Sequence, residues 1–201
     1  MNQVAKDAWI QGTKSAPMIT PLDLQPEQIQ IDDVTHALGF LCRYTGRTSR
    51  FYSVAEHSMI VWHAACELGL SEQARRWALA HDFGEAFLND VANPVKRTFV
   101  FEEYRKLETE IDNRIRARFS INVDAEELAA VRMIDVESCN VERWLLLGPP
   151  PRAWNMPTAP IGVTEALEHA WCRVDSDLGI HRTSFDDLRE YFRDAAHKVL
   201  G

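Results

Sequence analysis

The chain has 201 residues, which is long enough for one domain with a sizeable hydrophobic core. Its 46% hydrophobic and 26% charged residues are typical of a globular protein, and the formal net charge of −8 argues against general nucleic-acid binding, which needs a basic surface. The sequence shows no signal peptide and no apolar run near the roughly 18 residues of a membrane-spanning helix. We therefore expect a cytoplasmic protein that does not contact a membrane. The four scattered cysteines favour reduced thiols over disulfides.

The first predicted element is an irregular lead-in over residues 1–31, because three prolines between positions 17 and 26 interrupt any helix. The first helix should follow, with Asp32 or Asp33 as its cap, and should reach about residue 42. Apolar residues at helical spacing mark the face of this helix that packs into the core.

Beside that apolar face, His36, Phe40 and Arg43 follow one another at i, i+4 and i+7 spacing. An imidazole, an aromatic ring and a guanidinium on one ridge suit a phosphorylated aromatic ligand, and Tyr44 adds a hydroxyl beside them. An ordinary boundary face explains the same pattern, with Phe40 in the core and Arg43 as a surface cation. Both interpretations stay open at this point.

A second helix is predicted over residues 53–68. Ser53 followed three residues later by Glu56 is a capping box, which marks a helix start. His57 lies one turn into this helix, on its apolar side. Because a histidine on an apolar face is more often a satisfied core residue than a metal ligand, this position alone does not identify a site.

The third helix, capped by Ser71, is predicted to carry two adjacent potential metal ligands, His81 and Asp82. Glu85 follows one turn later, so the three side chains can border one cavity, and Asp90 adds a fourth ionisable group. Burying an unpaired charge is unfavourable by several kcal/mol, so such groups usually neutralise, pair or bind a metal. The alternative is a partly exposed helix end with solvated charges.

A loop over residues 89–97 follows and holds two cations, Lys96 and Arg97. Both are candidates for phosphate contacts, and so is Arg43, the two arginines because of their forked geometry. At least one of Lys96 and Arg97 is expected to be a plain surface charge. After this loop, an amphipathic helix is predicted over residues 101–119.

Another helix is predicted over residues 124–147, with Asp124 as its cap. Asp135 sits at the edge of its apolar stripe, where an aspartate is unusual because it is a poor helix former and is seldom buried. A salt bridge to Arg132 or Arg143 explains this position as well as a metal ligand does.

A proline-rich surface loop over residues 148–163 ends that helix. Two C-terminal helices are then expected, one from Thr164 and one from Ser184. Since no alternating strand pattern is present, the predicted fold class is all-α, a bundle of about seven helices in a single domain over residues 1–201.

The order of His57, the pair His81–Asp82 and Asp135, on three different predicted helices, resembles the HD-domain superfamily of metal-dependent phosphohydrolases. The run FYSVAEHS at residues 51–58, with the later carboxylates at matching offsets, resembles a short branch of it that contains bacterial 5′-deoxynucleotidases and phage-type dATP triphosphohydrolases. The resemblance extends from about residue 30 to 147. A His-Asp pair alone is a weak signal, whereas four ligands in this order are a strong one.

The resemblance implies one divalent ion, bound by His57, His81, Asp82 and Asp135. It also implies that Glu85 and Asp90 act at the substrate. Arg43 and Tyr44 match an Arg-Trp pair that lines the nucleotidase pocket, and the change to tyrosine leaves base and sugar selectivity open. The interval between the last two ligands contains no histidine, which disfavours a two-metal site and favours a mononuclear one.

Two imidazoles and two carboxylates suit Mn²⁺, Co²⁺, Fe²⁺ or Zn²⁺. Such an ion can polarise a phosphoryl group and lower the pKa of a water molecule. Glu85 is placed to orient that water or to pass a proton to the leaving 5′-oxygen, and Asp90 could accept a hydrogen bond from a sugar hydroxyl.

The predicted function is metal-dependent hydrolysis of deoxynucleotide phosphate esters. The products would be a deoxynucleoside and phosphate from a monophosphate, or a deoxynucleoside and triphosphate from a triphosphate such as dATP. The alternatives are a non-catalytic nucleotide-binding or sensor domain of the same fold and a purely structural helical module. The expected partners are the small nucleotide substrate and further copies of the chain, in a dimer or a larger homo-oligomer.

Overall fold

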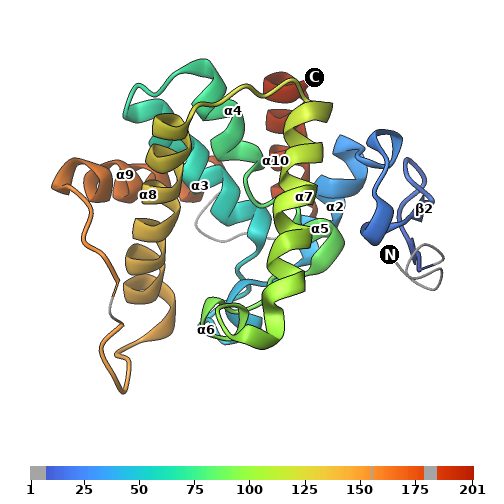
Figure 1. Ribbon diagram of the computed structural model, residues 1–201. Helices are drawn as coiled ribbons and strands as arrows, with labels where there is room; N and C mark the ends of the chain where they lie inside the picture. Colours follow the sequence, from blue (N-terminus) through green and yellow to red (C-terminus); the bar gives the residue numbers. More distant parts are fainter. Residues whose placement is uncertain (1–7, 155, 179–184) are drawn as a thin grey trace.

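A computed structural model of the protein describes residues 8–154, 156–178 and 185–201 (Figure 1). Within these ranges the chain is mostly helical, and the only sheet is a two-stranded hairpin near the N-terminus. Seven of the described helices have nine or more residues. The prediction of an all-α bundle of about seven helices is therefore confirmed.

The described helices, strands and turns fall into two groups, long helices and short elements. The long helices are α2 (Ile31–Phe40), α3 (Val54–Glu67), α4 (Glu72–Ala80), α7 (Glu102–Arg118), α8 (Ala125–Glu142), α9 (Ile161–Leu178) and α10 (Phe185–Leu200). The short elements are strands β1 (Ile10–Gln11) and β2 (Met18–Ile19), helices α5 (Glu85–Leu88) and α6 (Asn93–Lys96), 3₁₀ turns η1 (Pro21–Asp23), η2 (Pro26–Gln28), η3 (Arg43–Gly46) and η4 (Phe99–Phe101), and the π-helical turn η5 (Arg143–Leu147).

Three predicted helix caps are confirmed. The Ser53 hydroxyl accepts a hydrogen bond from the backbone N–H of Glu56 at 3.1 Å, and Ser71 caps α4 in the same way. Asp124 and Glu127 form a reciprocal capping box at the start of α8. These side chains satisfy N–H groups that have no partner within the first turn of a helix.

Two predictions for the N-terminal part are wrong. The first helix begins at Ile31, before Asp32 and Asp33, because Asp33 is instead drawn into a long-range contact and accepts a hydrogen bond from the backbone N–H of Thr13 at 2.5 Å. The lead-in is also not wholly irregular, since β1 and β2 pair as a short antiparallel hairpin. Strands of two residues are too short to show an alternating pattern.

The start of α9 was also predicted wrongly. The proline-rich loop ends at Pro160 and α9 begins at Ile161, so Thr164 lies inside the helix. Its hydroxyl donates to Glu137 Oε1 at 2.8 Å, which is a contact between helices and not a cap. The predicted cap at Ser184 lies outside the described residues.

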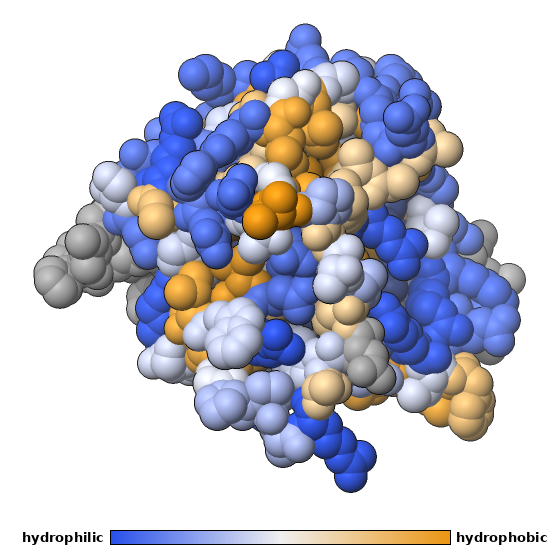
Figure 2. Space-filling view, turned by 90° about the vertical axis from the view of Figure 1, so that its left-hand side faces the viewer, coloured by the Kyte–Doolittle hydropathy of each residue, from blue (hydrophilic) through white to orange (hydrophobic). Residues whose placement is uncertain are grey.

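Helix α3 lies at the centre of the bundle, where it packs against α2, α4, α8, α9 and α10 (Figure 1). Eleven of its fourteen residues are buried, so it is enclosed on nearly all sides. On the side of α8 and α9, the surface is largely hydrophilic with separate hydrophobic patches (Figure 2). Within the described ranges, no helix is both long enough and apolar enough to cross a membrane.

Phe83 connects the core with the segment that carries the predicted ligands. Its side chain is fully buried, and its ring makes edge-to-face contacts with Phe119 at 6.0 Å and with Phe192 of α10 at 6.1 Å. Because Phe83 directly follows Asp82, this packing fixes the position of the backbone beside the ligands.

We predict that Phe83→Ala lowers the free energy of unfolding by about 3–5 kcal/mol, because it removes a buried aromatic ring and leaves a cavity. Chemical denaturation followed by circular dichroism measures this change. Phe99→Ala is the matched control, since Phe99 is 87% exposed and should change stability by less than about 0.5 kcal/mol. Equal stability of the two variants would contradict the role given to Phe83.

Candidate metal centre

Three of the predicted ligands converge in the interior. His57 comes from α3, His81 follows the end of α4, and Asp135 comes from α8. One ligand atom of each lies within 4.8 Å of the others, with the two Nε2 atoms 3.3 Å apart and His57 Nε2 3.3 Å from Asp135 Oδ1. This group could hold a metal ion.

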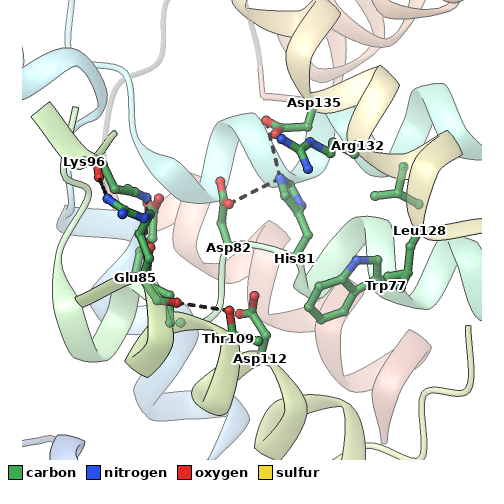
Figure 3. A pocket seen from close by; sticks show the side chains of 14 residues that line it. Trp77, His81, Asp82, Glu85, Lys96, Thr109, Asp112, Leu128, Arg132 and Asp135 are labelled. Carbon is green, nitrogen blue, oxygen red and sulfur yellow. Dashed lines mark hydrogen bonds and ion pairs between the residues drawn. The ribbon is translucent and has the colours of Figure 1, made fainter. Parts of the chain in front are cut away.

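Asp82, the fourth predicted ligand, lies against both imidazoles through different oxygens. Its Oδ2 is 3.4 Å from His57 Nε2. Its Oδ1 is 3.4 Å from His81 Nε2 (Figure 3). The structure therefore brings the four predicted ligands together, with the His57–His81–Asp135 group as the compact part.

The local backbone at His81 differs from the prediction. We expected the pair of ligands inside the third helix, but α4 ends at Ala80 and His81 is its C-cap residue. The ring of His81 folds back over the helix end, and its Nδ1 is 2.8 Å from the carbonyl oxygen of Ala78. A carbonyl left free by the last helical turn therefore orients the histidine.

The hydrogen-bond partners assign the tautomer of both histidines. Nδ1 of His57 lies 2.6 Å from Glu142 Oε1, and Nδ1 of His81 faces the Ala78 carbonyl. Since carboxylate and carbonyl oxygens only accept, each Nδ1 is the donor, and each Nε2 is directed toward the cluster. Holding one ring nitrogen through an oxygen acceptor is the usual arrangement of metal-binding histidines.

The ionisable groups of the cluster favour a positive charge between them. Burial lowers the pKa of His81, but Asp82 and Asp135 outweigh it and raise this pKa to about 9. Burial raises the pKa of Asp135, but hydrogen bonds from His57 and His81 outweigh it and hold this pKa well below its ordinary value. The carboxylates thus stabilise positive charge at the cluster, which is the condition that a bound cation needs.

Glu142 is a residue of this site that the sequence analysis missed. It is fully buried, and burial raises its pKa, but Arg43, the charge of His57 and hydrogen bonds from His57 and Tyr44 lower the pKa to about 2. A signal was available, because Glu142 lies seven residues after Asp135. Two helical turns place both carboxylates on the same face of α8.

Arg43 contacts two carboxylates of the site, those of Asp82 and Glu142. Its Nη1 is 3.4 Å from Asp82 Oδ2, and its Nη2 is 3.3 Å from Glu142 Oε2. Arg43 is buried, so the interpretation as a surface cation is wrong. Next to it, Tyr44 has a φ of 54°, a left-handed conformation that is unusual for a bulky residue, and its hydroxyl donates to Glu142 Oε2 at 2.6 Å.

The predicted ridge of His36, Phe40 and Arg43 is wrong, because α2 ends at Phe40 and Arg43 lies in the turn η3. Arg189 of α10 takes the place of the expected ligand. Its Nη1 lies 2.8 Å from His36 Nδ1, and its guanidinium stands 4.6 Å above the Phe40 ring. His36 lines a different cavity, together with Thr13 of the N-terminal segment.

A cavity of about 510 Å³ opens beside the ligands. Figure 3 shows Trp77 and Leu128 on one side of His81, and Glu85 and Lys96 on the other. Of the two predicted phosphate contacts in the loop over residues 89–97, Lys96 lines the cavity and pairs with Glu108 at 2.7 Å. Arg97 is exposed and lies outside the cavity lining.

Glu85 has the environment expected of a proton-carrying group. Its Oε2 is buried and has no hydrogen-bond partner among the described residues. Burial raises the pKa of Glu85 well above its ordinary value, and the carboxylates of Asp82 and Asp90 raise it further. Burial also raises the pKa of Asp90, which is half-buried and lies outside the cavity lining.

Asp112 of α7 is a second carboxyl group that the sequence analysis missed. It lines the cavity. Burial, with Asp82 and Glu108, raises its pKa to about 7, against the smaller opposing effects of His81 and Arg116. In the sequence it is one of many charged residues of this helix, so no local signal distinguishes it.

The fold and the ligand geometry define an all-α protein with a buried histidine–carboxylate group able to hold a metal ion. No family model matches the chain. The uncharacterized protein RCAP_rcc00048 of Rhodobacter capsulatus is 33% identical over 149 residues, which cover 71% of this chain and 75% of that protein. The chain belongs to the family of this protein. The uncharacterized protein YfdR of Escherichia coli is 32% identical over 98 residues, which cover 49% of this chain and 51% of YfdR.

We predict that Asp112→Asn stabilises the metal-free protein at pH 8 but not at pH 4. Because the folded-state pKa of about 7 exceeds the ordinary value of 3.8, ionisation of Asp112 opposes folding, and this penalty grows as the pH rises from about 4 to about 7. At about 1.4 kcal/mol per pKa unit, a shift of this size corresponds to about 4 kcal/mol.

Denaturation of the chelator-treated protein at the two pH values measures this difference. Glu110→Gln is the control, because Glu110 is exposed on the same helix and does not line the cavity. A gain in stability that is equal at pH 4 and pH 8 would mean that the Asp112 carboxyl is not titrating as described.

Proposed function

We propose that this protein is a metal-dependent hydrolase of deoxynucleotide phosphate esters, of the mononuclear HD-domain type. The observation that supports this most is the meeting of His57, His81 and Asp135 around one point, with Asp82 in contact with both imidazoles. The order of these residues in the sequence had suggested the same set. The substrate would be a deoxynucleoside monophosphate, or a triphosphate such as dATP.

The donor set fits a divalent transition metal. Two imidazole Nε2 atoms, each oriented through a hydrogen bond at Nδ1, and two carboxylates form a mixed nitrogen and oxygen site. We propose Mn²⁺, Co²⁺, Fe²⁺ or Zn²⁺ for this position, held by His57, His81, Asp82 and Asp135. When bound, such an ion polarises a phosphoryl group and lowers the pKa of a water molecule.

The side chains around the ligands suggest how the protein would assist hydrolysis. Glu85 would orient the attacking water or carry a proton on its buried Oε2 to the leaving 5′-oxygen. Lys96, which lines the cavity, would bind phosphate after exchanging its contact with Glu108. Asp90 would accept a hydrogen bond from the sugar.

The environment of Arg43 changes the role that we propose for it. Its guanidinium already contacts Asp82 and Glu142, so it would hold a ligand in place and balance buried charge, with Tyr44 beside it.

The expected assembly of the chain into a homo-oligomer stays a prediction.

We predict that His57→Ala and Asp82→Ala each reduce bound metal more than ~10-fold after dialysis and abolish hydrolysis. Loss of a metal ligand should weaken metal binding more than loss of a side chain that only hydrogen-bonds to a ligand. Metal analysis measures the first effect. Product analysis with each deoxynucleoside mono- and triphosphate in Mn²⁺, Co²⁺ or Zn²⁺ measures the second.

His63→Ala is the matched control, because His63 is another buried histidine of α3 whose Nε2 faces the Tyr191 hydroxyl at 2.8 Å. Full metal occupancy in His57→Ala and Asp82→Ala would refute the proposed site. Wild-type protein that binds metal and nucleotide without turnover would instead support the sensor alternative.

We predict that Glu85→Gln keeps the metal and the nucleotide but lowers kcat by ~10²–10⁴-fold, the usual contribution of a positioned acid or base. The amide preserves the shape of the side chain but cannot transfer the proton. Steady-state kinetics and metal analysis of the same preparation measure both effects, with the exposed Glu110→Gln as control. A near wild-type kcat would reduce Glu85 to a neighbour of Asp82.

A further inference from the structure

Glu142 lies at the centre of a buried hydrogen-bond network behind the ligand cluster. Its Oε1 accepts from His57 Nδ1 at 2.6 Å and from the Tyr52 hydroxyl at 2.8 Å. Its Oε2 accepts from the Tyr44 hydroxyl at 2.6 Å and from Arg43 Nη2 at 3.3 Å. A carboxylate has about four lone-pair sites, and four donors fill them.

We propose that Glu142 is the positioning residue that fixes the tautomer of His57 and thereby directs its Nε2 atom to the metal centre. This inference rests on the proposed metal site. Because an ionised carboxylate carries no proton of its own, both of its edges accept, and His57 must donate from Nδ1. The remaining ring nitrogen, Nε2, then faces His81 and Asp135.

The same carboxylate also acts on a second ligand. Arg43 bridges Glu142 and Asp82, so the charge of Glu142 balances a guanidinium that lies directly beside the cluster. Without this balance, a buried cation would stand next to the position of a metal ion and would weaken metal binding by repulsion. Glu142 therefore supports His57 by a direct hydrogen bond and Asp82 through Arg43.

A purely structural role as the counter-ion of Arg43 is the competing explanation, and the substitution Glu142→Gln separates the two. Glutamine has the shape of glutamate but presents one accepting edge and one donating edge. The charged Arg43 forms the stronger hydrogen bond and would take the amide oxygen. The amide NH₂ group would then face His57, whose Nδ1 would have to accept, and the ring proton would move to Nε2.

The test compares Glu142→Gln with Glu137→Gln in the full-length protein. Glu137 is a matched control because it is also buried on α8, five residues earlier, where its carboxylate accepts from Thr164 Oγ1 at 2.8 Å and from Asn140 Nδ2 at 2.9 Å. Circular dichroism establishes that both variants are folded.

Two measurements are made on each protein. The first is the ¹H–¹⁵N resonance of the His57 Nδ1 proton in the metal-free state, which is assigned by its absence from His57→Gln. A strong hydrogen bond to a carboxylate should shift it downfield and protect it from exchange. The second is calorimetric titration with Mn²⁺ or Zn²⁺ alone.

We expect the resonance in wild type and in Glu137→Gln, its loss in Glu142→Gln, and a metal affinity 10–100-fold lower in Glu142→Gln, the range for removal of an outer partner of a metal-binding histidine. The proposal would be overturned if Glu142→Gln kept the His57 Nδ1 proton resonance of wild type, or if Glu142→Gln and wild type bound metal with equal affinity.

If Glu142→Gln fails to fold, the wild-type spectrum still tests the proposal. Absence of the His57 Nδ1 proton resonance from the wild-type protein would contradict the tautomer assigned to His57. If wild type shows the resonance but binds neither metal, the proposed function fails, while the tautomer assigned to Glu142 stands.

Discussion

Buried charge of alternating sign is the constraint on which the rest of the structure depends. The potential ligands lie at the junction of α3, α4 and α8, where an isolated charge would be unfavourable by several kcal/mol. The chain compensates in a continuous series, since Arg43 contacts Asp82 and Glu142, Glu142 contacts His57, and Asp135 contacts both imidazoles. The two Nε2 atoms face each other in the middle, and a cation between them would complete the alternation.

The surrounding fold holds these groups by ordinary packing and capping. Capped starts set the position of α3, α4 and α8 along the chain, and the buried ring of Phe83 anchors the turn directly after Asp82. The left-handed backbone of Tyr44 and Thr45 directs Arg43 and Tyr44 inward after α2 has ended. Strain of this kind persists only where contacts over-determine it, and here the hydroxyl of Tyr44 is bound to Glu142.

The residues His36 and Phe40 show how a ligand-like pattern can be satisfied within the chain. An imidazole and an aromatic ring on one ridge do attract a guanidinium, but it comes from Arg189 of α10. The sequence pattern suggests a phosphorylated aromatic ligand, and the actual partner was missed because a residue 153 positions away in the sequence cannot be identified from local spacing.

The sequence alone determined the all-α class and the caps Ser53, Ser71 and Asp124, because cap chemistry and helical periodicity act over three to seven residues. The set of four ligand candidates came from the resemblance of their order along the chain to the HD-domain superfamily, since spacing along a single helix left His57 and Asp135 open. Only the tertiary structure decided that Arg43 is buried between two carboxylates, that Glu142 orients His57, and that Asp112 faces the cavity. The contacts of Arg43 alone join residues 39 and 99 positions apart. Such contacts, and the pKa values that follow from them, depend on how helices pack in space, which no spacing along one helix encodes.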